Sequence, residues 1–267
     1  MGIVALVGDA TTTTAVALAS AWSADDDVVV LEFDPSGGSL AAWMDTPAVP
    51  TLSTFVAGRS ASMTDGGSPS WRDVESIVHG SSSGLRFIAA PARSREAARS
   101  IGEASISMLP VLTSSSATVL ADVGRTRPAE GIPAILASAA DIVVVHRQDP
   151  ASPGAASVRL ERLVESVEQL GLLDGQLHLA VIGDDPFDVD EIATYVAMHA
   201  SVSLESATTI AVDPLSAMVL AGRSGVSAKR LSRLPLLRST APLADLLAAA
   251  TTSRSEAQRS FEGAGTT

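Results

Sequence analysis

The chain has 267 residues, 46% of them hydrophobic, and a net charge of −12, which suits one large domain or two small ones with a substantial core. It contains no cysteine, so disulfides, cysteine-ligated zinc and thiol catalysis are excluded. Lys229 is the only lysine among 18 basic residues, so no mechanism can use a lysine before that position. The acidic balance argues against a protein whose main task is to neutralise nucleic-acid phosphates.

No apolar run reaches the roughly 18–20 residues of a membrane span, and Met1–Val7 has no basic region typical of a signal peptide. We therefore expect a cytoplasmic protein without an integral membrane segment. Residues 1–250 are predicted to form one domain. Residues 251–267 are polar, end in Gly263-Ala264-Gly265-Thr266-Thr267, and are predicted to be a flexible tail.

Short β-branched apolar runs alternate along the chain with longer stretches that have helical spacing. The predicted strands are Ile3–Val7, Val28–Phe33, Leu85–Ala89, Thr118–Asp122, Ile142–Val145, His178–Ile182 and Thr208–Val212. The predicted helices are Thr12–Trp22, Gly38–Met44, Arg95–Leu109, Ile132–Ala139, Ala155–Gln169 and Val189–Ala200, with a further short helix near Trp71–Val78 inside the Ser/Gly-rich segment Gly58–Gly84. This alternation predicts a doubly wound α/β fold with a mostly parallel sheet of seven or eight strands. Ligands bind such sheets at the carboxyl ends of the strands.

Four segments at predicted strands carry the candidate chemistry. They are Val7–Ala19 with its turn Gly8-Asp9-Ala10, Val30–Leu40 with Glu32-Phe33-Asp34-Pro35, Ala117–Gly124 with Asp122, and the apolar strand Ala140–Val145. A strand, a short turn of small residues and a threonine-rich helix start form the geometry of a phosphate-binding loop, where backbone N–H groups and the positive helix end face the turn. A plain strand–helix turn with threonine caps is the alternative for the first segment, and Asp122 could simply cap a neighbouring helix.

In this order and spacing the segments resemble the MinD/ParA family of P-loop ATPases, most closely the atypical CpaE/TadZ-type members that accompany pilus and secretion machinery. The resemblance extends from Met1 to about Ala249. It includes Asp213-Pro214 after the last predicted strand, which in the family lies near the nucleotide base before a final helix closes the domain. The resemblance implies the P-loop NTPase fold and a homodimer.

The family's phosphate loop reads Lys-Gly-Gly-x-Gly-Lys-Thr-Thr. Laid onto this chain, its lysines fall on Leu6 and Thr11, its glycines on Val7, Gly8 and Ala10, and its magnesium-binding threonine on Thr12. Both lysines are therefore absent, although the second one normally reaches the β and γ phosphates. Asp9 adds a negative side chain where a polyphosphate would lie. The resemblance thus implies a degenerate Walker A loop that has lost tight ATP binding and ordinary hydrolysis.

The remaining family positions are partly kept. Glu32 replaces the aspartate that positions the attacking water, so we name no catalytic residue beyond this degenerate carboxylate. Thr12, Asp34 and Asp122 would hold magnesium if a Mg-nucleotide bound. The positions that the resemblance assigns to nucleotide binding are Gly8, Asp9, Ala10, Thr11, Thr12, Thr13, Asp213 and Pro214. We expect no resident cofactor, or at most loosely bound ATP or ADP with Mg.

Other candidates carry less. His146 ends a strand on the ligand side and is the only histidine that merits a test. Gly80-Ser81-Ser82-Ser83-Gly84 matches the G-x-S-x-G pattern only by letters, because a nucleophile elbow follows a strand whereas this run precedes one. The acidic cluster from Asp184 to Glu191 could bind a cation, but carboxylates at a helix start explain it more simply.

The sequence favours a degenerate MinD/ParA-like protein that acts as a localisation, assembly or regulatory factor. Its expected partner is a protein, such as a pilus or secretion ATPase, which would recruit it to a polar or membrane-associated complex. An active but unorthodox ATPase is the first alternative and a DNA-associated partition protein the second. We do not expect DNA binding at net −12, and interpret the basic segment Arg223–Arg238 as a protein-docking face.

Overall fold

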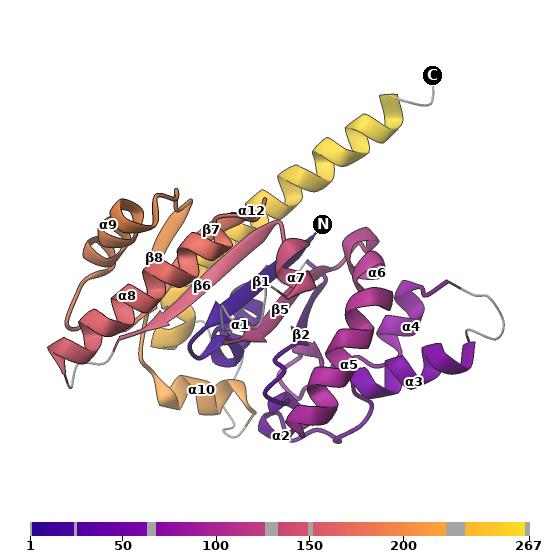
Figure 1. Cartoon of the computed structure of the whole chain (residues 1–267). Helices are drawn as coiled ribbons and strands as arrows, with labels where there is room; N and C mark the ends of the chain where they lie inside the picture. The colour runs from indigo at the N-terminus through magenta and orange to yellow at the C-terminus, as the bar shows by residue number, and fades with distance from the viewer. Residues whose placement is uncertain are drawn as a thin grey trace.

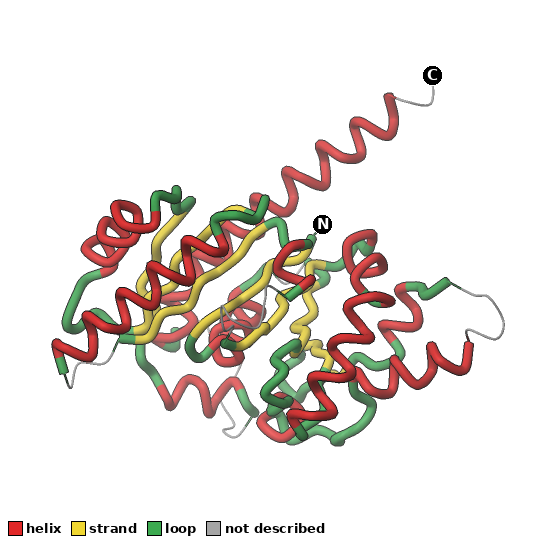
Figure 2. Tube along the Cα trace, in the orientation of Figure 1, coloured by secondary structure: helices red, strands yellow, loops and turns green. Residues whose placement is uncertain are grey.

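The computed structural model describes residues 2–23, 26–62, 68–125, 133–148, 152–222 and 233–264. At its centre is an eight-stranded sheet with the strand order β3-β4-β2-β5-β1-β6-β7-β8 (Figures 1 and 2). The strands are β1 Ile3–Gly8, β2 Val28–Glu32, β3 His79–Gly80, β4 Arg86–Ile88, β5 Thr118–Gly124, β6 Asp141–Arg147, β7 Gln176–Ile182 and β8 Ser206–Ile210.

All neighbouring strands run parallel except β3, which pairs antiparallel with β4 at one edge. The central strands β1, β5 and β6 are buried along almost their whole length, as expected for parallel strands covered on both faces. The predicted α/β fold with a mostly parallel sheet is therefore confirmed.

Helices cover both faces of the sheet. They are α1 Thr11–Ala21, α2 Leu40–Trp43, α3 Leu52–Ser62, α4 Trp71–Glu75, α5 Ser94–Ser107, α6 Leu109–Ser114, α7 Ala134–Ala137, α8 Pro153–Leu170, α9 Val189–Ala200, α10 Pro214–Leu220 and α12 Pro235–Ala264. One apolar core joins the sheet to α3–α9, and the other joins it to α1, α2, α10 and α12. The turn between β1 and α1 lies at the carboxyl edge of this double layer.

The predicted elements agree with the structure to within three residues at each boundary. The helix predicted over Ile132–Ala139 is shorter, because Pro133 before it is extended and α7 ends at Ala137; Ile132 lies outside the described residues. The structure adds α3, α6, α10 and the two-residue strand β3. The tail predicted from residue 251 is helical up to Ala264, because α12 continues through it, and its end projects away from the body (Figure 1). Within the described residues no helix has the length and apolar character needed to cross a membrane.

Candidate functional site

The turn that was predicted to bind phosphate contains only two residues, Asp9 and Ala10, between the end of β1 and the start of α1. Gly8 has φ +121°, and a Cβ there would lie 2.2 Å from the Val145 carbonyl oxygen, so the position requires glycine. The Asp9 N–H donates to that same carbonyl at 2.8 Å. The chain thus stays bound to β6 until it enters the helix.

Ala10 completes the turn in the left-handed region, at φ 51° and ψ 33°, and caps α1 without a side-chain hydrogen bond. The family pattern has glycine here, and an alanine in this conformation is strained by about 1–2 kcal/mol. The turn thus adopts at Ala10 a conformation that glycine, the residue of the family pattern, would adopt without strain.

Thr12 and Asp122 are in direct contact across the turn. The Thr12 hydroxyl donates to Asp122 Oδ2 at 2.5 Å, and the Gly124 N–H donates to Asp122 Oδ1 at 3.2 Å. Asp122 is fully buried and Thr11 is 3% exposed. The structure thus brings together the two residues that were expected to share a magnesium ion, and joins them directly.

Asp34 lies against Gly124, where an added Cβ would be 2.3 Å from the Asp34 carboxylate. Its Oδ1 accepts from the Ser36 N–H at 2.7 Å and from the Ser36 hydroxyl at 2.5 Å. The third predicted magnesium ligand therefore flanks Asp122 but is hydrogen-bonded within its own loop.

Glu32 points into the protein and is 1% exposed. Its carboxylate accepts from the backbone N–H groups of Ser39 at 2.5 Å, Leu40 at 3.0 Å and Ala90 at 3.0 Å. These bonds tie the start of α2 to the segment after β4. The arrangement gives Glu32 a structural task and leaves little of its carboxylate to position a water molecule.

Burial sets the electrostatics of this edge. Desolvation raises the pKa of Asp122 above its usual 3.8, and the nearby Asp34 charge raises it further. Hydrogen bonds from Thr11, Thr12 and Gly124 lower it, but by less than burial raises it. Desolvation likewise raises the pKa of Glu32 above 4.5, against its three backbone donors. Oxygen ligands of this kind suit Mg²⁺, but among the described residues no group of three or more His, Asp or Glu side chains is arranged to hold a metal.

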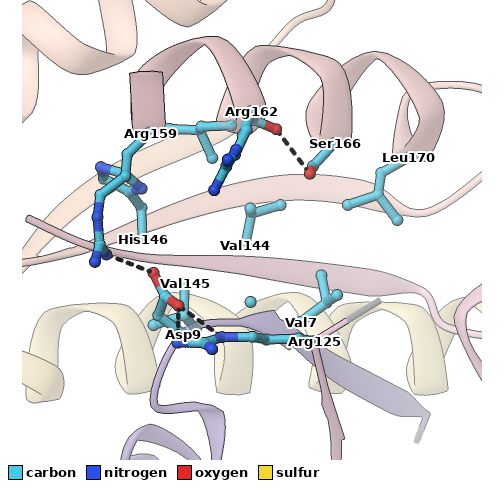
Figure 3. A pocket seen from close by; sticks show the side chains of 12 residues that line it. Val7, Asp9, Arg125, Val144, Val145, His146, Arg159, Arg162, Ser166 and Leu170 are labelled. Carbon is cyan, nitrogen blue, oxygen red and sulfur yellow. Dashed lines mark hydrogen bonds and ion pairs between the residues drawn. The ribbon is translucent and has the colours of Figure 1, made fainter. Parts of the chain in front are cut away.

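Asp9 points to the other face of the sheet (Figure 3). Its Oδ1 accepts from Arg125 Nε at 2.9 Å and lies 2.7 Å from Arg125 Nη2, while Oδ2 lies 3.8 Å from Arg159 Nη1. Oδ2 also accepts from the Arg147 N–H at 3.3 Å. The side chain predicted to repel a polyphosphate is thus neutralised by arginines of this chain.

Asp213 and Pro214 begin α10, which packs on α1. Asp213 caps this helix by accepting from the Ser216 N–H at 3.1 Å and from the Ser216 hydroxyl, and the side-chain bond lowers the pKa of Asp213.

The acidic cluster from Asp184 to Glu191 contains a helix start, because Asp188 and Glu191 form a capping box on α9. Thr13 lies in the first turn of α1.

The sequence analysis missed a polar network at the opposite, amino edge of the sheet. His178 and Asp141 are fully buried, with His178 Nε2 3.2 Å from Asp141 Oδ1 and His178 Nδ1 2.9 Å from the Ser206 hydroxyl. Arg254 of α12 forms an ion pair with Asp141 Oδ2. Only the fold brings these residues together, since they are far apart in the chain.

The sheet order, the strand–turn–helix start and the Thr–Asp pair together define a P-loop ATPase fold of the MinD/ParA type. A ParA family ATPase from Chlorobium tepidum TLS aligns with a TM-score of 0.65 at 13% identity, over 91% of this chain and 97% of its own. MinD from Pyrococcus horikoshii OT3, complexed with Mg-ADP, aligns with a TM-score of 0.62 at 14% identity, over 92% and 95%.

The MinC:MinD cell division complex of Aquifex aeolicus aligns with a TM-score of 0.54 at 13% identity, over 92% of this chain and 95% of the matched one. No family model matches the sequence, and no curated protein matches it. At these identities the similarity establishes the fold alone.

Proposed function

We propose that this protein is a degenerate MinD/ParA-like protein that has kept the scaffold, has lost the ATPase machinery, and acts as a localisation or assembly factor. The observation that carries the proposal is that the turn between Gly8 and Thr11 has no lysine and that its Asp9 N–H is bound to the Val145 carbonyl oxygen. A P-loop binds the phosphates through free backbone N–H groups and a lysine.

The charged groups at the turn support the same reading. Thr12 and Asp122 are hydrogen-bonded to each other. Glu32, at the position expected for a catalytic carboxylate, is bound to backbone N–H groups. The Asp9 carboxylate is paired with Arg125 and Arg159. Arg125 and Arg159 are both engaged by the Asp9 carboxylate, so a bound triphosphate would have to compete with Asp9 for them.

The assembly role is supported by the fold and by what its structural neighbours do. One neighbour is a complex of MinD with MinC, and a scaffold that does not turn over nucleotide is left with surfaces for docking. We infer a homodimer and a protein partner, such as a pilus or secretion ATPase, that recruits the chain to a polar or membrane-associated complex. The basic segment interpreted as a docking face lies mostly outside the described residues, which include Arg233 and Arg238 from it. Light scattering tests the dimer: one chain per particle would contradict it.

Calorimetric titration with Mg-ATP and Mg-ADP, followed by a phosphate-release assay, tests the loss of ATPase function. We expect no saturable binding at nucleotide concentrations up to about 1 mM and no phosphate release above buffer. Micromolar binding with Mg-dependent hydrolysis would overturn the proposal.

The kept Thr12–Asp122 pair favours a second candidate, an unorthodox ATPase in which loop amides, Thr11–Thr13 and an arginine replace the lysines. It predicts that Thr12→Ala and Asp122→Ala both abolish nucleotide binding, whereas Thr252→Ala, which removes an exposed hydroxyl on α12, leaves binding intact. Equal behaviour of all three variants would exclude this candidate.

A further inference from the structure

A pocket of ≈ 300 Å³ lies between α8 and the carboxyl ends of β1 and β6, on the face of the sheet away from α1 (Figure 3). Arg159 and Arg162 extend into it from α8, and Asp9 with Arg125 closes it from the sheet side. Its volume is at the lower end of the range for small-molecule sites, about 300–1,000 Å³. The pocket therefore suits a compact ligand.

The charge of the pocket is opposite to that of the whole protein. Arg125, Arg159 and Arg162 face a single carboxylate, Asp9, so its lining carries a net charge of +2 on a chain of net −12. His146 adds no charge at neutral pH, because burial lowers its pKa below 6.5. A pocket with this excess attracts a dianion.

Two of the polar groups have unused hydrogen-bonding capacity. His146 is 6% exposed and makes no side-chain hydrogen bond to any described residue, although it lines the pocket. The Arg162 guanidinium likewise has no ion pair or hydrogen bond within the described part of the chain, and it points from α8 toward the sheet (Figure 3). Among the described residues the His146 ring nitrogens are not buried atoms that lack a partner, so the imidazole is open to the pocket and can form a hydrogen bond with a molecule bound there.

The remaining lining is apolar. Val7 and Val144 line the pocket from the sheet, and Leu163 and Leu170 line it from α8. Arginine binds phosphate through two parallel N–H···O bonds, while the valine and leucine side chains would cover a hydrocarbon or aromatic group beside the anion.

We propose that this pocket is a binding site for a small organic phosphate monoester. Arg162 and Arg159 hold the phosphate, His146 completes its hydrogen bonds, and the apolar wall takes the organic group. A phosphate monoester carries about −1.5 to −2 charges at pH 7, which matches the net +2 of the lining. Asp9 lies in the turn before α1 and contacts Arg159. An anion bound to Arg159 would compete with Asp9 and so change the contacts of that turn. This inference stands apart from the proposed function, since it requires neither presence nor absence of ATPase activity.

Phenyl phosphate combines both features in one small probe, with inorganic phosphate and benzoate as partial probes. Calorimetric titration in phosphate-free buffer should show one phenyl phosphate per chain with a Kd of about 0.1–1 mM. Inorganic phosphate should bind about tenfold more weakly because it lacks the apolar group. Benzoate, with a single charge, should also bind about tenfold more weakly.

Two variants should change the affinity in opposite directions. Arg162→Ala removes the unpaired guanidinium and should weaken phenyl phosphate about tenfold, whereas Asp9→Asn removes the competing charge and should tighten it several-fold. Arg99→Ala is the matched control, because Arg99 has a 72% exposed side chain and lies on α5, away from the pocket. Thermal melts verify that each variant is folded.

Three results would overturn the proposal. One is the absence of saturable phenyl phosphate binding at about 10 mM. A second is an equal loss of affinity in Arg162→Ala and Arg99→Ala, which would indicate non-specific attraction. The third is loss of binding in Thr12→Ala with no effect of Arg162→Ala, which would move the anion to the start of α1.

Discussion

The two edges of the sheet handle buried carboxylates differently. At the amino edge, Asp141 is paired with Arg254 of α12 and hydrogen-bonded to His178, so its charge has a cationic partner. At the carboxyl edge, Asp122 and Glu32 have only hydroxyl and backbone N–H donors. One edge thus joins distant elements through an ion pair, whereas the other keeps two acids buried without a cation.

This difference bears on the proposed loss of ATPase function at the carboxyl edge. In a working P-loop, the lysine and Mg²⁺ compensate the carboxylates and the phosphates together. Here the carboxylates are stabilised by the protein's own donors, and the arginines nearest the turn serve Asp9 on the other face. The geometry of the motif is thus kept while its charges are arranged for stability.

The largest expected effect comes from the amino edge. Asp141→Ala leaves the buried His178 without its acceptor and the partly exposed Arg254 without its ion pair, and we expect this to cost about 3 kcal/mol. Urea unfolding monitored by circular dichroism measures this loss. The exposed Asp174→Ala should change the free energy of unfolding by less than about 0.5 kcal/mol. Equal values for the two variants would show that the Asp141 network does not stabilise the fold.

Glu32→Gln tests the structural task of the carboxylate at the other edge. The amide keeps the shape but turns an N–H₂ group toward backbone donors, so the buried Ala90 N–H, or those of Ser39 and Leu40, lose their acceptor. We expect a loss of about 2 kcal/mol at pH 7. The exposed Glu168→Gln is the control. If Glu32→Gln were as stable as the control, the three backbone bonds would not hold α2 in place.

Stability should also depend on pH through Asp122 at the carboxyl edge. Because burial raises the pKa of Asp122 in the folded state, the folded protein binds this proton more tightly than the unfolded chain. Its contribution to stability is then present below about pH 3.8 and is lost as the pH rises through the raised folded value. Asp122→Asn lacks this titration. Its amide oxygen can accept from the Gly124 N–H, and its NH2 group can donate to the Thr12 hydroxyl, which reverses the direction of that hydrogen bond. The stability of Asp122→Asn relative to the unsubstituted protein should therefore increase from pH 4 to pH 8 in urea titrations. A difference that stays flat or falls would contradict the raised pKa.

The smallest expected effect concerns the turn itself. Ala10→Gly removes the strain of a left-handed alanine at φ 51°, offset by the greater flexibility of glycine in the unfolded chain. The net gain should be about 0.5 kcal/mol. Ala257→Gly, at an exposed position within α12, should instead lose about 1 kcal/mol. Calorimetric melts of both variants give the signs, and a destabilised Ala10→Gly would show that the alanine is not strained.

The sequence predicted the parallel sheet well because its strands are continuous β-branched runs buried on both faces, such as Val28–Glu32. It missed β3 because two residues carry no periodicity. It also predicted flexibility beyond Thr251, where α12 continues to Ala264, since polar composition alone does not distinguish a solvated helix from a disordered tail.

At the site, motif spacing was enough to place Thr12 opposite Asp122, because both positions are fixed by the ends of neighbouring strands. It could not show that Glu32 points inward to backbone donors, since that depends on the path of the chain around Ser39 and Ala90. The pairing of Asp9 with Arg125 and the joining of Asp141 to Arg254 span more than 100 residues each. Such contacts follow from the fold and have no local pattern.

Native mass spectrometry of the purified protein, before and after addition of Mg-ATP, tests the loss of the phosphate site most directly. The proposed loss predicts spectra of the unliganded chain in both cases, because a turn without lysine does not hold a triphosphate tightly. A Mg-ATP adduct that forms at micromolar nucleotide and disappears in Thr12→Ala would contradict it.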